Sequence, residues 1–171
     1  MAYRTRTYIA GDWTGDSDLI GNLQFWNESA NWDLSYIDAH ELTQARDTSL
    51  PCSIKKSLKE RLDASKTFVL VVGDHTKDLT KGGCRYCQSY SIYGGCHRGH
   101  SVDHRSFIEY ECEYAVDNDL KIVVLYNSCN VMRGMCPEVL RYKGAHLAAI
   151  FRGADGKLYW DVGGIAQALR D

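Results

Sequence analysis

The stretch TFVLVVG, residues 67–73, is a continuous apolar run that ends at a glycine. A second run of the same kind, KIVVLY, follows at 121–126. Strands that are buried on both faces have this unbroken, β-branched pattern, whereas strands with one solvated face alternate apolar and polar residues. Both segments are therefore predicted to be central strands of a parallel sheet with helices on its two faces.

Strand-like and helix-like segments alternate along the rest of the chain. The elements expected from periodicity are strands at 6–11, 34–38 and 146–151 and helices at 18–28, 52–65, 106–119, 136–142 and 162–170. In the helix at 52–65, apolar residues four apart should face the sheet, and the lysines and arginine should face solvent. The alternation predicts an α/β fold with a doubly wound parallel sheet, whose ligands bind beyond the carboxyl ends of the strands.

Composition limits the classes of function. The chain has 171 residues, 44% of them hydrophobic and 25% charged, which is typical of one globular domain spanning 1–171. A net charge of −2 gives no basic footprint for nucleic acid. Neither a signal peptide nor an apolar run of membrane-spanning length is present, so we expect a cytoplasmic protein without a membrane partner.

A Cys/His-rich insert at 82–104 interrupts the pattern. It reads GGCRYCQSYSIYGGCHRGHSVDH and holds three of the seven cysteines of the chain. A Cys-x-x-Cys knuckle grips zinc in many small sites, so a structural zinc is one interpretation. Its candidate ligands are Cys84, Cys87, Cys96 and His100. Reduced thiols and solvated histidines are the alternative, because a second Cys-x-x-Cys is missing.

The helix after the insert begins with a capping box. Ser106 and Glu109 have the spacing in which each side chain bonds the backbone N–H of the other, so both have a structural explanation. At about 100° per residue, Glu111 lies at the edge of the apolar face of this helix. A carboxylate there is partly desolvated and can point along the top of the sheet, whereas an ordinary surface glutamate is the alternative.

Two polar loops are further candidates. The acidic turn that begins at Asp12 resembles the phosphoacceptor corner of a receiver domain, with Asp74 as a possible second carboxylate. A matching lysine after the last strand is not evident, so this interpretation is incomplete. In the loop at 41–49, Arg46, Asp47 and Ser49 precede a helix. They suit either helix capping or the binding of an anion or a ribose.

Three segments together resemble a known family: YIAGDWTGDSD; SYIDAHELTQARDTS with the basic helix and apolar strand that follow it; and FIEYECEYAVDNDLKIVVLYN. They are similar in order and spacing, over about residues 5–128, to the TIR-like domains of the Thoeris antiphage system, the ThsB-like group. The resemblance implies a flavodoxin-like TIR fold with a five-stranded, mainly parallel sheet and helices on both faces. The insert at 82–104 is a departure from the family pattern.

The resemblance also implies an activity. Such TIR domains cleave the bond between nicotinamide and ribose in NAD⁺, and Thoeris members make a cyclic or conjugated ADP-ribose signal that a downstream effector senses. The spacing Phe107-x-x-x-Glu111 matches the essential glutamate of the family and the aromatic residue before it. The remaining NAD⁺-binding residues implied are Asp12 and Trp13 after the first strand and Asp38, Arg46, Asp47 and Ser49 around the second.

Two other functions stay open at this point. A non-catalytic TIR adaptor would act by self-association through the 41–49 loop, and Glu111 would then be dispensable. A flavodoxin-like domain without NAD⁺ activity, such as a degenerate receiver, would be modified by phosphodonors at Asp12 or Asp74. Cleavage of NAD⁺ is the first hypothesis, because it alone gives Glu111 a role.

Overall fold

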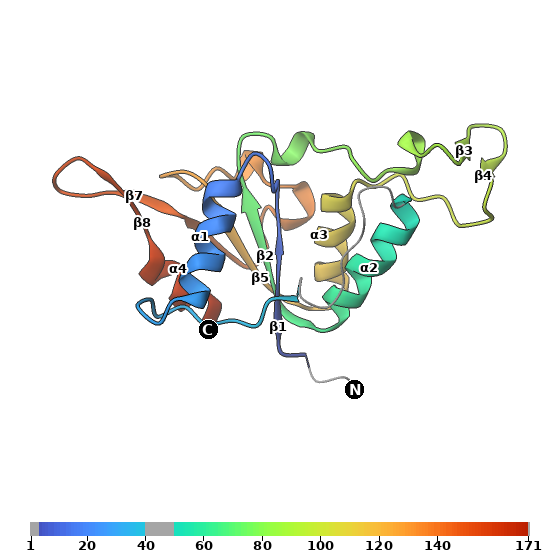
Figure 1. Ribbon diagram of the computed structural model, residues 1–171. Coiled ribbons are helices and arrows are strands. Elements are labelled where there is room, and N and C mark those ends of the chain that lie inside the picture. The colour runs from blue at the N-terminus through green and yellow to red at the C-terminus, as the bar shows by residue number, and fades with distance from the viewer. Residues whose placement is uncertain (1–3, 40–49, 171) are drawn as a thin grey trace.

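The computed structural model describes residues 4–39 and 50–170 and shows an α/β fold around a four-stranded parallel sheet (Figure 1). Its strands run in the order β1-β2-β5-β6. Their bounds are β1 Arg6–Ala10, β2 Ser65–Val72, β5 Lys121–Tyr126 and β6 Ala145–Ala148. The two apolar runs, in β2 and β5, pair with each other at the centre, as their unbroken hydrophobicity predicts.

The fifth strand expected at 34–38 is reduced to an isolated parallel bridge between Thr7 and Asp38. The Thr7 amide still donates to the Ile37 carbonyl at 2.8 Å. The Thr5 amide, two residues earlier, donates instead to the Ala64 carbonyl at 3.3 Å, so the ladder does not continue along this segment. The segment nevertheless lies beside β1 on the side away from β2, which keeps the flavodoxin-like order of the sheet.

Helices cover both faces of the sheet (Figure 1). α1 (Ser17–Glu28) and α4 (Val162–Arg170) pack on one face, and α2 (Pro51–Asp63) and α3 (Phe107–Asp117) pack on the other. Alternate residues of β2 supply both cores, with Phe68 and Leu70 toward α2 and α3 and Val69 and Val71 toward α1. None of the helices in the described ranges is long and apolar enough to cross a membrane.

The prediction that the lysines and the arginine of α2 face solvent is partly wrong. Lys55 and Arg61 are only 6% and 7% exposed, respectively. The Lys55 ammonium bonds the Arg105 carbonyl at 2.7 Å and pairs with the Asp103 carboxylate at 3.2 Å. Arg61 lines a cavity beside Glu111. Both charges are buried because residues about fifty positions away in the sequence fold over them, which helical periodicity does not reveal.

The C-terminal part also differs in detail from the elements that periodicity predicts. The run expected as one strand at 146–151 divides between β6 and β7 (Ile150–Arg152), because β7 leaves the sheet to pair with β8 (Leu158–Trp160). Figure 1 shows this hairpin projecting from the side of the molecule that carries α4. The helix expected at 136–142 is a single 3₁₀ turn, Glu138–Leu140, after Pro137.

The insert leaves and re-enters the fold through a narrow neck. Gly82 has a φ of +110°, and a Cβ there would lie 2.5 Å from the Phe107 ring. A Cβ on Gly83 would lie 2.6 Å from the His104 carbonyl oxygen. The paired glycines therefore allow the outgoing and returning chains to touch. A short turn at Thr76–Asp78 precedes the neck. Beyond the neck are a second turn, Cys84–Tyr86, and a two-stranded ribbon, β3 Tyr90–Ser91 and β4 Gly95–Cys96, that projects past α2 (Figure 1).

The returning chain is held to the helices by charged groups. Arg105 forms hydrogen bonds to both oxygens of Asp103, at 3.0 and 2.9 Å, and to Glu113 of α3 at 2.6 Å. Partial burial opposes ionisation of Asp103, but hydrogen bonds from Arg105 and Lys55 outweigh it and lower the pKa of Asp103 to about 2. The insert is therefore tied to α2 by Lys55 and to α3 by Arg105.

Replacing Lys55 with methionine is expected to loosen this attachment. The substitution keeps the length of the side chain but leaves two backbone carbonyls and Asp103 without their ammonium partner. We expect the free energy of unfolding to fall by about 2 kcal/mol, and amides of the insert to exchange faster with solvent. Lys59→Met is the control, because its pair with Asp63 is exposed and contributes about 0.5 kcal/mol. Urea unfolding and hydrogen exchange measure both; equal effects of the two variants would contradict the prediction.

Candidate active site

A cavity of about 340 Å³ opens at the carboxyl end of β1. This is the point where the chain order reverses in the sheet, because the 34–38 segment lies on one side of β1 and β2 on the other. Ligands of open α/β sheets bind at such a point. Four parts of the chain line it: β1 with the loop to Thr14, α2, the segment just before the insert, and the first turns of α3.

Glu111 lies in the wall of this cavity and is 6% exposed. Its Oε1 accepts a hydrogen bond from the Tyr8 hydroxyl of β1. Burial raises the pKa of Glu111 to about 7, although the Tyr8 hydrogen bond and the positive charge of Arg61 favour the ionised form. A glutamate with a pKa near neutrality inside a cavity is a frequent property of catalytic carboxyl groups.

The capping box predicted at the start of α3 is confirmed and sets this orientation. The Ser106 amide donates to Glu109 at 2.7 Å, and the Glu109 amide donates to the Ser106 hydroxyl at 3.2 Å. With the helix start fixed there, Ile108, Cys112 and Ala115 face the core. Glu111 is next to Cys112 in the helix and is buried with it. It is therefore not an ordinary surface glutamate.

Of the residues predicted to bind NAD⁺, the structure brings Asp12, Trp13 and Phe107 to the same cavity as Glu111. Asp12 Oδ1 accepts from the Thr14 amide at 3.0 Å, which shapes the turn after β1, and Trp13 is 44% exposed. Asp38 does not line the cavity; its backbone bridges Thr7 and its carbonyl accepts from Arg6 at 2.9 Å. Arg46, Asp47 and Ser49, with the 41–49 loop, lie outside the described residues.

The sequence pattern gave no role to three polar residues of the cavity, Tyr8, Arg61 and Lys81. Arg61 lies seven residues after Ile54 and three after Leu58, so it shares their helical face. An arginine on an apolar face was the signal that could have identified it. Tyr8 is the hydroxyl-bearing residue in the apolar segment YIA. Lys81 had no comparable signal, because it lies in the irregular segment between β2 and the insert.

The predicted zinc ligands are not brought together. Within residues 4–39 and 50–170, no group of three or more His, Cys, Asp or Glu side chains is placed to hold a metal ion. The Cys84 sulfur accepts from the Asp103 amide at 3.2 Å in the neck, and Cys96 lies in β4 opposite Tyr90. Cys87 follows the 3₁₀ turn that contains Cys84, and His100 is exposed. This arrangement does not fit a zinc site. The contacts of Lys55 and Arg105 tie the insert to the helices instead.

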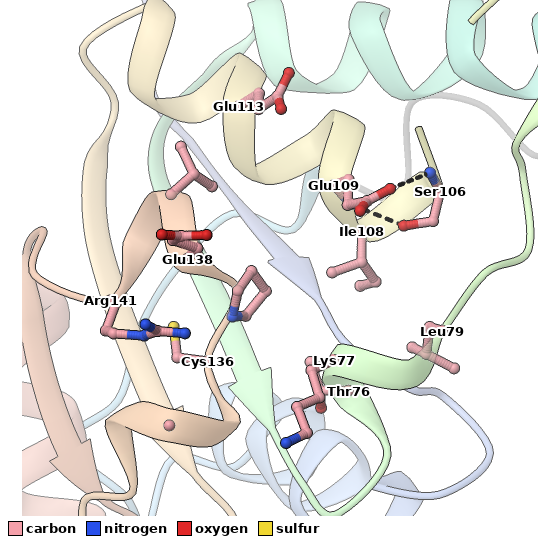
Figure 2. Close-up of a pocket in the computed structure, with 13 residues that line it drawn as sticks. Thr76, Lys77, Leu79, Ser106, Ile108, Glu109, Glu113, Cys136, Glu138 and Arg141 are labelled. Atoms are coloured by element: carbon pink, nitrogen blue, oxygen red, sulfur yellow. Dashed lines mark hydrogen bonds between the residues drawn. The ribbon is translucent and has the colours of Figure 1, made fainter. Parts of the chain in front are cut away.

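A larger cavity of about 510 Å³ lies on the other side of the start of α3 (Figure 2). It contains neither Glu111 nor the loop after β1, and two of its carboxylates already have partners: Glu109 in the capping box and Glu113 with Arg105. Figure 2 shows the Ser106–Glu109 pair at its edge. We therefore place the candidate active site in the smaller cavity.

The acidic corner considered for a receiver domain forms a separate polar pocket of about 290 Å³. Asp12, Asp16 and Asp74 line it, and Asn127 donates to Asp16 at 3.0 Å. Burial and the neighbouring carboxylates raise the pKa of Asp16, against the Asn127 hydrogen bond. No lysine is among the described residues that line this pocket, so the constellation of a receiver stays incomplete.

Residues 8–81 match the family described as Thoeris protein ThsB, TIR-like domain. The match confirms the resemblance over the first two of the three segments that carry it, and it ends one residue before the insert. It includes Asp12 and Trp13, whereas Phe107 and Glu111 lie beyond it. The comparison with curated proteins gives no match.

Proposed function

Since residues 8–81 match the TIR-like domain of ThsB, we propose that this protein cleaves the nicotinamide–ribose bond of NAD⁺ as part of antiphage defence signalling. The observation that carries the proposal is Glu111, a buried carboxyl group with a pKa of about 7 in the wall of the cavity at the switch point of the sheet. Only one such carboxylate is required by the chemistry.

Glu111 would act on the charge that develops in the transition state. When the C–N bond breaks, nicotinamide leaves with the bonding electron pair as a neutral molecule, and the ribose becomes oxocarbenium-like. A carboxylate held near the anomeric carbon stabilises this cation, most strongly where water is excluded. The cation is then captured by water, which gives ADP-ribose, or by a hydroxyl of the same molecule, which gives a cyclic product; in both cases the nucleophile loses a proton.

Other residues of the cavity suit the rest of the substrate. Trp13 is exposed enough to stack on a nicotinamide or adenine ring. Lys81 offers a point charge to a phosphate oxygen, a role in which lysine is common. The cavity volume of about 340 Å³ is that of a small-ligand site and matches one end of a dinucleotide rather than the whole molecule.

The remaining steps of the pathway are proposals that follow from the family. We place the protein in the cytoplasm, where NAD⁺ is available, and assign its product to a downstream effector that senses the nucleotide. Self-association through the 41–49 loop would bring cavities together, as in an assembled TIR enzyme. An adaptor that only assembles would leave Glu111 without a chemical role, so a test of turnover decides between these functions.

Incubation of the purified protein with NAD⁺, followed by mass spectrometry of the products, tests the proposal. Release of nicotinamide with an equal amount of an ADP-ribose species is expected, and the mass distinguishes a hydrolysed product from a cyclised one by one water. Assays at high protein concentration and with crowding agents cover the case in which assembly is needed. Absence of nicotinamide release under all of these conditions would overturn the proposal in favour of an adaptor.

The pH dependence of turnover gives a second, more specific expectation. Because burial raises the pKa of Glu111 to about 7, its ionised form predominates only above that pH. The value of kcat/KM should therefore fall tenfold for each pH unit below about 7 and level off above it. A steady-state profile between about pH 5 and 9 measures this. A profile that stays level down to pH 5, as expected for the ordinary glutamate pKa of 4.5, would separate Glu111 from the rate-limiting chemistry.

A further inference from the structure

The Tyr8 hydroxyl is a polar group in the buried core, at the middle position of β1. Tyr8 is 0% exposed, and its ring stacks on Phe68 of β2 with centroids 5.9 Å apart and planes at 14°. Packing accounts for the ring, because a phenylalanine would fill the same space. It does not account for the hydroxyl, since burying a hydroxyl is unfavourable unless it has a hydrogen-bond partner.

That partner is Glu111. The hydroxyl donates to Oε1 across the space between the sheet and α3, and both residues line the candidate active site. Stacking on Phe68 restricts the tyrosine ring, so the donor is fixed by the sheet rather than by a mobile loop. A carboxylate has two oxygens, and the hydrogen bond to Oε1 leaves Oε2 as the remaining acceptor.

We propose that Tyr8 is the positioning residue of the active site: its hydroxyl holds Oε1 of Glu111 so that the second carboxylate oxygen is presented to the ribose of NAD⁺. The inference rests on the proposed function and adds a residue outside α3 to it. A neutral donor suits this task, because it orients the carboxylate without cancelling the negative charge that stabilises the oxocarbenium-like ribose. Residues that act through a catalytic group in this way must themselves be held rigidly.

The proposal has a consequence that a purely structural tyrosine would not have. The Tyr8 hydrogen bond favours the ionised form of Glu111 and so lowers its pKa against the effect of burial. Removing the hydroxyl should therefore raise the pKa of Glu111 further, by about one unit for one hydrogen bond to a charged group. Arg61 also favours the ionised form of Glu111, and its charge is unchanged by this substitution.

Tyr8→Phe tests the proposal, with Tyr126→Phe as the matched control. Tyr126 is also 0% exposed and also lies in a central strand, but its hydroxyl is hydrogen-bonded to His146 at 2.8 Å, away from the cavity. We expect Tyr8→Phe to move the acid limb of kcat/KM up by about one pH unit and to lower kcat about tenfold on the alkaline plateau. Tyr126→Phe should leave the limb in place and change kcat less than about twofold.

A direct titration keeps this inference separate from the proposed function. The carboxyl carbon of Glu111, followed by ¹³C NMR and assigned by its absence in Glu111→Gln, reports the pKa without any turnover. A higher Glu111 pKa in Tyr8→Phe but not in Tyr126→Phe supports the contact even if wild type proves inactive on NAD⁺, a result that would overturn the proposed function alone. An unchanged pKa, or an active Tyr8→Phe with the wild-type limb and plateau, would overturn the role of Tyr8.

Discussion

Replacing Glu111 with glutamine is expected to reduce NAD⁺ cleavage about a thousandfold. Removing one group that stabilises developing charge in a buried site typically lowers kcat by this order. Glutamine keeps the size of the side chain and can still accept the Tyr8 hydrogen bond, so the cavity should keep its shape. Only the negative charge is lost. Nicotinamide release, followed by chromatography over long incubations, measures the residual rate.

Glu113→Gln is the control for this prediction. Glu113 lies two residues further along α3, but it pairs with Arg105 and borders the other cavity rather than the candidate site. Its substitution should change nicotinamide release less than about twofold. If Glu111→Gln kept wild-type turnover, or if Glu113→Gln were equally impaired, the assignment of Glu111 as the catalytic carboxylate would be wrong.

The second large effect is expected on stability. The pKa of Glu111 is about 7 in the folded protein against 4.5 as its ordinary value. The folded state therefore keeps the proton to higher pH than the unfolded state, and the stability present at low pH is lost as the pH rises through about 7. The free energy of unfolding should fall by about 2.5 kcal/mol between pH 5 and 8 from this group alone. Urea unfolding at several pH values measures it.

The comparison with Glu111→Gln isolates this contribution. His146 acts in the opposite direction, because burial and Arg133 lower its pKa and stability is then lost as the pH falls. The difference between wild type and Glu111→Gln cancels such groups. We expect this difference to change by about 2.5 kcal/mol in favour of the variant from pH 5 to 8. A constant difference would show that Glu111 titrates at its ordinary pKa and is not desolvated.

Together, the two outcomes would show that Glu111 is retained for activity at the expense of stability. A buried carboxyl group beside one tyrosine hydroxyl destabilises the fold when ionised, whereas an apolar residue of similar size would not. Strain of this kind is typical of functional sites. The Lys55–Asp103–Arg105 cluster has the opposite character, because its charges are matched and its hydrogen bonds hold the insert in place.

Local patterns predicted the elements of the fold well. The runs at 67–73 and 121–126 lie within or next to β2 and β5, and the capping box starts α3 at Ser106. Each of these depends on neighbours within a few residues, which the sequence displays directly. The strand at 34–38 failed because the Thr5 amide, which would continue the ladder beyond Thr7, bonds the Ala64 carbonyl instead.

The sequence by itself determined the α/β alternation, the central strands, the family match over 8–81 and the position of Glu111 at the edge of the apolar face of its helix. Only the tertiary structure decided which groups surround Glu111. Tyr8 is 103 residues away from it in the sequence, and Lys55 finds its partners about fifty residues away. A buried charge or hydroxyl is stable only beside such distant partners, and chain folding, not local periodicity, brings them together.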